Sequence, residues 1–407
     1  MKKISYKSFL IVFASLFSLT LGLTGCSEIK KGSVPKNSKE IHLRVWESKD
    51  GIDEFIKQAG KAYTAQHPNI IIDFINVDIH AEIETLESDI QKGIAPDIIS
   101  APHDNLGKIV TKKLVLPTEN ASSVSRQVLG SCSKALTYNN TMYGYPISAE
   151  TYALFYNRRL ISDNEVPRTW EELVQWVQRF NAQNPGKFGF VMDVMSIYYS
   201  ILFTTANGNR LYGESGTDAY NPRMNTPEAI RGMKFFQTLR SSLGLTNAEL
   251  STSSCDGLFA SGNVAMHITG LWNVNTFEKA GLDFNVAALP SLPGENKPAA
   301  SFSGTRGMFV TASSAHPEEA ADFLTFLLSP EMQQLRFKLT GAMPSINTTV
   351  SSKYMNGFLQ QLDYAFPMPS IPQMGKFWGE ADTTLRNIWN GADVESEMSK
   401  FNNNIKS

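Results

Sequence analysis

Three acidic residues and a set of aromatic residues lie where the sequence predicts the ends of helices and strands. They are Asp50, Asp104, Glu150, Tyr198, Tyr199, Trp272 and Trp378. Loops at the ends of elements commonly line clefts. A sugar has flat apolar faces edged by hydroxyl groups, so it is recognised by aromatic planes that stack on it and by carboxylates that accept its hydroxyl protons. These residue types favour the binding of a small polar ligand such as a sugar.

Each of these residues also has a purely structural explanation. Trp378 follows Phe377 on a predicted final long helix, where apolar residues repeat at helical spacing and face the core. Asp104 could cap the helix that follows it. Glu150 could be a solvated charge at the end of a strand, and Trp272 a core residue beside Gly270. Periodicity leaves these alternatives open.

The sequence contains none of the common catalytic or cofactor motifs. GxSxG, Walker A, HExxH and GxGxxG patterns do not occur, and the six histidines form no pair at metal-ligand spacing. We therefore predict no catalytic residue, no cofactor and no metal, and we interpret each histidine as structural. A glycosidase needs only two carboxylates at the right separation, so a surface-anchored carbohydrate-active enzyme stays as an alternative of a different class.

Apolar patterning predicts alternating strands and helices. Residues 41–46 alternate as a strand does, residues from Ile52 to Tyr63 repeat at helical spacing, and residues 70–77 form a second strand. A helix over 82–91, a buried strand at 97–99 and a helix from near Asp104 follow. Thr169 and Glu172 form a capping box, and Thr226-Pro227 opens another helix. This alternation predicts the α/β class with a parallel or mixed sheet.

The first residues have the layout of a secretory signal. Lys2, Lys3 and Lys7 precede an apolar stretch that is too short for a membrane span. The segment Leu23-Thr24-Gly25-Cys26 resembles the lipobox of bacterial lipoproteins. We therefore predict a signal peptide over 1–25, lipidation at Cys26, a flexible tether over 26–40, and a location on the extracytoplasmic face of the cell membrane.

Length, charge and cysteine count limit the number of domains, the class of partner and the possible disulfides. A chain of 407 residues exceeds one usual core, so two domains are expected. The net charge is −2, and loss of the three leader lysines makes it about −5, which offers no basic surface for nucleic acid. Cys132 and Cys255 could pair in an oxidising compartment, although two buried free thiols are the interpretation we favour.

Several segments, in order, resemble the maltose and maltodextrin-binding branch of the family 1 extracellular solute-binding proteins, the receptors of ABC sugar importers. The matching segments are Ala95-Pro96-Asp97-Ile98-Ile99 with Ala101-Pro102-His103-Asp104, Tyr143 to Glu150 running on to Asn157, Pro167 to Leu173, Phe259-Ala260-Ser261-Gly262 with Gly270-Leu271-Trp272, and Ile371-Pro372-Gln373-Met374 to Trp378. Their order and spacing match over roughly residues 40 to 405.

The resemblance implies a two-lobe fold of the type II periplasmic-binding-protein kind, with a ligand cleft between lobes joined by three hinge crossings. It places residues 41–148 with 304–341 in one lobe and residues 149–303 with 342–407 in the other, with crossings near 149–152, 301–305 and 342–345. It implies a monomer that captures an oligosaccharide and delivers it to the membrane permease subunits of an ABC transporter. Lobe closure would depend on contacts that exist only in the closed state.

Within this resemblance, Asp50, Asp104 and Glu150 match acidic sugar-contacting positions, and Tyr198, Trp272 and Trp378 match stacking aromatic positions. The chain departs from the maltose binders at three places. Ala101 stands where they have an aromatic residue, Asn105 where they have an arginine, and Ser196 where they have a further acidic contact. A receptor for another polar solute is therefore the alternative within the binding class.

Overall fold

The computed structural model describes residues 39–48, 52–77, 82–244, 251–348, 350 and 352–406. Contacts divide the chain into two units, Met1–Lys39 and Glu40–Ser407. The predicted signal peptide, nearly all of the predicted tether, and Cys26 lie outside the described residues. Asp50 also lies outside them, between the first strand and the first helix.

Strands and helices alternate along the unit Glu40–Ser407. The strands are β1 Ile41–Glu47, β2 Ile70–Asn76, β3 Ile98–Pro102, β4 Thr137–Tyr138, β5 Thr141–Met142, β6 Tyr145–Asn157, β7 Phe188–Val191, β8 Val264–Gly270, β9 Phe284–Ala287, β10 Phe302–Val310 and β11 Phe366–Pro367. The α-helices are α1 Ile52–Gln66, α2 Glu82–Gln91, α3 Leu106–Thr111, α4 Ala121–Gln127, α5 Gly130–Ala135, α6 Trp170–Gln183, α7 Ile197–Ser200, α8 Pro227–Ser242, α9 Thr252–Ala260, α10 Val274–Lys279, α11 Pro317–Leu327, α12 Pro330–Thr340, α13 Met355–Leu362, α14 Met374–Trp389 and α15 Val394–Asn404. Short 3-10 helices are η1 His103–Asn105, η2 Ile201–Thr204, η3 Ala206–Gly208 and η4 Leu271–Asn273.

Local sequence signals explain where several helices begin. At the start of α6, Thr169 accepts a hydrogen bond from the Glu172 amide while the Glu172 carboxylate accepts from the Thr169 amide, which confirms the predicted capping box. Helix α8 begins with Pro227 after the capping residue Thr226, as predicted. The predicted helix at 82–91 is confirmed as α2. The predicted strand at 97–99 begins one residue later and runs on to Pro102.

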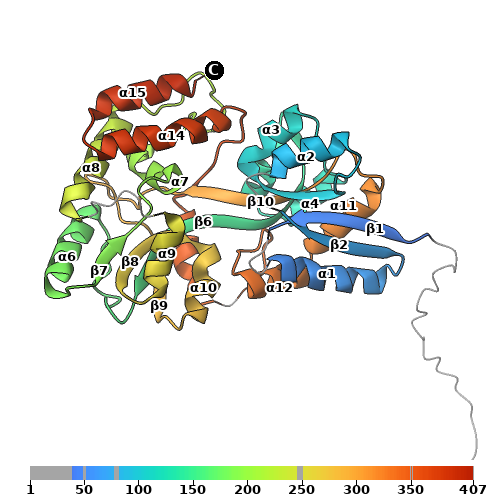
Figure 1. Ribbon diagram of the computed structural model, residues 1–407, viewed down its shortest axis with the longest axis horizontal. Helices are drawn as coiled ribbons and strands as arrows, with labels where there is room; N and C mark the ends of the chain where they lie inside the picture. The colour runs from blue at the N-terminus through green and yellow to red at the C-terminus, as the bar shows by residue number, and fades with distance from the viewer. Residues whose placement is uncertain are drawn as a thin grey trace, which may run out of the picture. The chain divides into compact units, whose positions relative to one another are not determined.

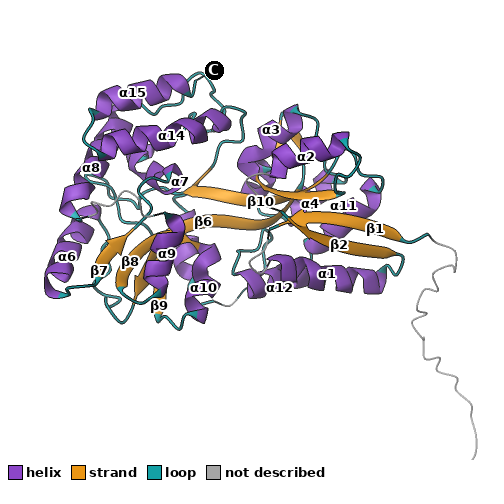
Figure 2. Cartoon of the chain, in the orientation of Figure 1, coloured by secondary structure: helices purple, strands orange, loops and turns teal. Residues whose placement is uncertain are grey.

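The described strands form one mixed sheet of nine strands and a separate β4–β5 pair. Its main order is β2-β1-β3-β10-β6-β8-β7, in which β1, β2 and β3 are parallel, and β6 and β10 are antiparallel to the strands beside them in this order. Strand β11 pairs with β10 in parallel. Strand β6 pairs with β10 through residues 145–151 and with β8 through residues 152–156. In Figure 1, β6 and β10 run from one group of helices to the other, and Figure 2 shows helices on both sides of the strands.

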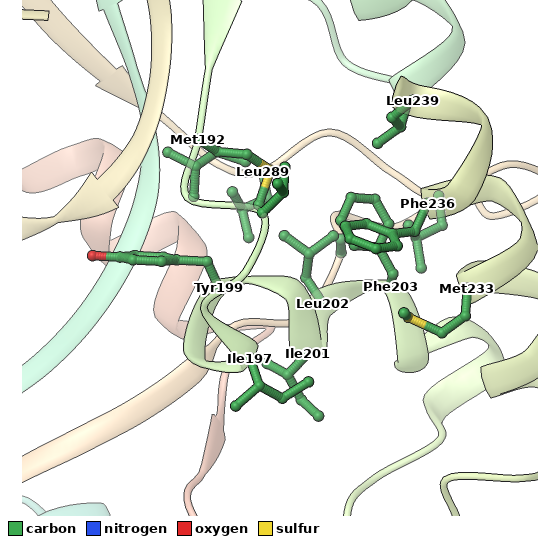
Figure 3. Packing of buried hydrophobic residues seen from close by; sticks show 14 of the residues in the cluster. Met192, Ile197, Tyr199, Ile201, Leu202, Phe203, Met233, Phe236, Leu239 and Leu289 are labelled. Carbon is green, nitrogen blue, oxygen red and sulfur yellow. The ribbon is translucent and has the colours of Figure 1, made fainter. Parts of the chain in front are cut away.

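Helices cover the sheet through separate apolar clusters. One cluster joins α1, α11 and α12 to β1, β6 and β10 and contains Phe55, Tyr63 and Phe323. A larger one joins α6, α7, α8 and α14 to β6 and β8 and contains Trp170, Phe203 and Phe236; part of it appears in Figure 3. Burial of such side chains contributes about 1.5–3 kcal/mol each. The lobe boundaries themselves stay a prediction.

The two described cysteines are both free and buried, as the favoured interpretation had it. Burial raises the pKa of the Cys132 thiol, and it raises the pKa of the Cys255 thiol to about 12. Both thiols therefore stay protonated at neutral pH. Among the described residues, no group of His, Cys, Asp and Glu could hold a metal ion, and no helix is long and apolar enough to cross a bilayer.

Candidate ligand-binding site

The structure joins Trp378 and Asp104, which are 274 positions apart in sequence. The indole Nε1 of Trp378, on α14, donates to Oδ2 of Asp104, on η1, at 3.1 Å. Trp378 lies beside the fully buried stripe that contains Phe377 and Leu385, and it remains half-buried. Asp104 occupies neither the N-cap of η1 nor that of α3, so the capping role is not observed.

Four aromatic rings form a continuous row that we call the aromatic row: Trp272, Tyr198, Phe302 and Trp378. Neighbouring ring centroids are 6.1, 6.0 and 6.1 Å apart along it. These separations are within the range of favourable aromatic contacts. Trp272 is 39 % exposed at one end, and Trp378 is half-buried at the other. Phe302 was not singled out from the sequence, because a buried strand phenylalanine carries no separate signal.

The placement of Trp272 depends on the residue two positions before it. Strand β8 ends at Gly270, and η4 begins directly afterwards. A Cβ atom at Gly270 would lie 2.1 Å from the Trp272 ring. Any larger residue would therefore collide with the indole where it lies over the strand end.

Glu150 lies half-buried on β6, opposite Gly304 of β10. Its Oε1 accepts a hydrogen bond from the Ser148 hydroxyl at 3.1 Å. A Cβ atom at Gly304 would lie 3.6 Å from Glu150 Oε2 and 3.7 Å from Cε of Met368, so the carboxylate and the Met368 side chain both lie next to the glycine. Glu150 is therefore not a solvated charge at the end of a strand, because its carboxylate is partly buried and accepts a hydrogen bond from Ser148.

The pKa of the Tyr198 hydroxyl responds to both Glu150 and Asp104. Desolvation of its hydroxyl raises the pKa of Tyr198 well above the usual value, and the nearby charges of Tyr199, Glu150 and Asp104 raise it further. The ring keeps some exposure although its hydroxyl is desolvated. The Tyr198 hydroxyl is therefore neutral at pH 7, and it lies near enough to Glu150 and Asp104 for their charges to act on it.

Tyr199 is placed differently from Tyr198. It is 3 % exposed and belongs to the apolar cluster around α7 and α8. Figure 3 shows its ring projecting from the segment of Ile197 and Ile201, away from Phe203 and Phe236. Its hydroxyl bonds to Thr269, and burial raises its pKa. Tyr199 supports Tyr198, whose ring centroid is 5.2 Å away, and presents no surface of its own.

A buried histidine next to Asp104 fixes the geometry of η1. His103 Nδ1 accepts from the Thr305 amide at 3.2 Å, so the proton sits on Nε2, which donates to the Met368 carbonyl at 2.9 Å. Desolvation lowers the pKa of His103 to about 4, so the ring is neutral at pH 7. The structural interpretation of this histidine is confirmed, and it links η1, β10 and the chain after β11.

Two surface hollows lie away from the aromatic row. One of about 650 Å³ is lined by parts of α10, α12 and the segment up to Tyr354, and one of about 470 Å³ lies at the start of α6. Each of them also contains carboxylate and aromatic residues, Glu278 with Tyr354 in the first and Glu165 and Glu172 with Trp176 in the second. The aromatic row differs from both because its four rings contact one another in sequence and Trp378 bonds to Asp104, so we take it with Asp104 and Glu150 as the candidate site.

Comparison with known families gives a match over most of the chain. The model of bacterial extracellular solute-binding proteins matches residues 58–356. The chain belongs to the bacterial extracellular solute-binding protein family.

Relatives within the solute-binding proteins cover nearly the whole chain. A galactooligosaccharide-binding protein of Bacillus subtilis is 28 % identical over 93 % of this chain and 92 % of its own length. A maltooligosaccharide ABC transporter solute-binding lipoprotein of Streptococcus pneumoniae is 24 % identical over 91 % of this chain and 89 % of its own.

Solved structures of solute-binding proteins show the same fold. A cyclo/maltodextrin-binding protein complexed with maltotetraose is 30 % identical, with a TM-score of 0.77, over 91 % of this chain and 98 % of that one. A maltotriose-binding protein of Thermus thermophilus gives a TM-score of 0.80 at 23 % identity, over 89 % and 98 %. The predicted two-lobe type II fold is thereby confirmed.

Proposed function

We propose that this chain is the substrate-binding lipoprotein of an ABC importer and captures an oligosaccharide of the maltodextrin type. The observation that carries the proposal is the aromatic row flanked by Asp104 and Glu150. Its rings offer planes for sugar faces, and its carboxylates accept hydroxyl protons. The proposed contacts are Asp104, Glu150, Tyr198, Trp272 and Trp378, together with Asp50 outside the described residues.

Capture would require the ligand to compete for groups that already contact one another. The Trp378 indole on α14 donates to Asp104 on η1, so these two proposed contacts come from elements far apart in the sequence. A sugar hydroxyl that bonds to Asp104 would replace the indole N–H, while the indole plane would become available for stacking. Binding would thus couple to the relative position of α14 and η1.

A second candidate is an oligosaccharide other than an α-glucan. Ala101 replaces the aromatic residue of the maltose binders and is 1 % exposed, so it provides no stacking plane. One lost plane is worth about 1 kcal/mol beyond its buried area. The relative from Bacillus subtilis that is named for galactooligosaccharide binding supports including that sugar class.

The test is calorimetric titration of the whole chain, in a detergent without a sugar head group, with maltotetraose and with a galactooligosaccharide. We expect saturable binding of one series and recovery of the sugar intact by chromatography. Binding should weaken in the Trp272→Ala and Trp378→Ala variants while both variants stay folded, as checked by circular dichroism. Unchanged affinity in both variants would overturn the site, and altered sugar would favour the carbohydrate-active enzyme.

Membrane anchoring through Cys26 is part of the proposal. The lipobox-like segment and the lipoprotein relative support it. Replacement of Cys26 by Ser should release the protein from the membrane fraction into the soluble fraction. A variant that stays with the membrane would contradict lipidation at this residue.

A further inference from the structure

Three buried charged side chains, from β1, β10 and α12, lie near one another. Glu47 is 0 % exposed, Arg306 8 % and Arg336 2 %. Arg306 donates to both carboxylate oxygens of Glu47, through Nη2 to Oε1 and through Nε to Oε2 at 3.3 Å. The charge of Glu47 is therefore balanced by Arg306, and Arg336 brings a further positive charge.

Arg336 has few partners for a buried guanidinium. Its Nη2 lies 3.5 Å from the Ser148 hydroxyl oxygen, and its Cζ lies 5.5 Å from the ring centroid of Phe55. Within the described residues, Nε and Nη1 have no hydrogen-bond partner. Burying a guanidinium is costly. We therefore look for the role of Arg336 at the Ser148 hydroxyl, the group that its Nη2 contacts.

Ser148 connects this charge to the candidate site. Its hydroxyl receives the Arg336 contact and donates to Glu150 Oε1 at 3.1 Å. The two residues are two positions apart on β6, so their side chains leave the same face of the strand. A positive charge behind the hydroxyl strengthens its donation to a carboxylate. The positive charge of Arg336 and the negative charge of Glu150 also attract each other.

We propose that Ser148, supported by Arg336, is a positioning residue that holds the Glu150 carboxylate for the ligand. The Ser148 hydroxyl bonds to Oε1, while Oε2 lies beside Gly304, which has no side chain of its own. The inference rests on the proposed function, since it takes Glu150 as a ligand contact. Neither Ser148 nor Arg336 is proposed to touch the ligand.

The test is a double-mutant cycle on the whole chain, titrated with maltotetraose and with a galactooligosaccharide in parallel. Ser148→Ala should weaken binding about tenfold, as expected for loss of a hydrogen bond to a charged group. In the Glu150→Ala background, the same change should have no further effect, because the group it positions is gone. The matched control is Ser133→Ala, another buried serine with a hydroxyl partner, Ser125, which should leave affinity unchanged.

Arg336→Met provides an independent arm. This substitution roughly keeps the side-chain volume, removes the positive charge of Arg336 and leaves Glu47 paired with Arg306. The unfolding midpoint should therefore not fall, while the affinity for the oligosaccharide should fall several-fold. Weak binding in Glu150→Ala with wild-type affinity in Ser148→Ala, or full additivity in the cycle, would overturn the positioning role alone. Wild-type affinity in Glu150→Ala, or no binding of either sugar by the unaltered chain, would instead overturn the proposed function and the inference with it.

Discussion

At the scale of single residues, Gly270 decides where the indole of Trp272 can lie. Adding a Cβ atom there would place it 2.1 Å from the ring, and the half-exposed indole would swing away. We expect Gly270→Ala to weaken oligosaccharide binding roughly fivefold, the loss of about one stacking plane, as measured by calorimetry. The control is Gly257→Ala in α9, where nothing lies within 4 Å of the new atom. That variant should bind normally, and equal affinity in the two would contradict the role of Gly270.

His103 makes stability depend on pH. Its pKa is about 4 in the folded chain against a usual 6.5, because the ring is desolvated, so the unfolded chain binds the proton more readily. Stability should therefore fall as pH falls from 6.5 towards 4, by about 3 kcal/mol in total for this group. His103→Gln keeps a donor and an acceptor and should remove that part of the slope in urea unfolding. His316→Gln should retain it, and an unchanged slope in His103→Gln would count against this assignment.

At the scale of elements, the buried ion pair of Glu47 and Arg306 connects β1 to β10. Burial alone would raise the pKa of Glu47, but the charge and hydrogen bond of Arg306, with the charge of Arg336, outweigh it and lower the pKa. The stabilisation is present above the unfolded value of 4.5 and is lost as pH falls through the lower folded value.

Breaking this pair should be costly at neutral pH. Glu47→Gln should lower the free energy of unfolding by about 3–5 kcal/mol at pH 7, because the buried Arg306 charge would lose the negative charge that balances it. The difference from wild type should shrink in acid. Glu395→Gln, which breaks the exposed pair with Lys234, should change little. A small effect at Glu47, equal to that at Glu395, would show that the buried pair does not fasten the strands.

The helices and strands could be predicted from the sequence more accurately than the contacts between them. The limits of α2 and the capping box of α6 follow from local spacing, so they could be predicted. Strand β3 extends to Pro102 because it pairs with β10, a partner that local patterning cannot identify. The bond between Glu47 and Arg306 joins residues 259 positions apart, and one sequence gives no signal for it.

The candidate site shows the same limit. Trp378 and Asp104 were each singled out by type and family resemblance, yet only the fold brings the indole to the carboxylate. Tyr198 and Tyr199 are neighbours of the same type, and their opposite placements follow from the turn of α7 against the core. Ser148 and Arg336 belong to no recognisable sequence motif. The hydrogen bonds that connect them to Glu150 depend on β6 lying beside α12.

At the scale of the whole molecule, the Trp378–Asp104 hydrogen bond connects α14 to η1, which the predicted boundaries assign to different lobes. Trp378→Phe keeps an aromatic plane and removes the indole donor. A hydrogen bond to a charged group is worth about 1.5–3 kcal/mol, so the unliganded chain should shift by about tenfold to a hundredfold towards open forms. Small-angle scattering should then give a larger radius of gyration for this variant without sugar. Identical radii would mean that this bond does not hold the lobes.

The most direct measurement is a crystal structure of the chain grown with the oligosaccharide that binds in calorimetry. We predict sugar rings stacked on Trp272 and Trp378, with ring hydroxyls on Asp104 and Glu150 Oε2. The Ser148 hydroxyl should still donate to Glu150 Oε1. Sugar bound instead in the hollow between α10 and α12, or at the start of α6, would contradict the central claim.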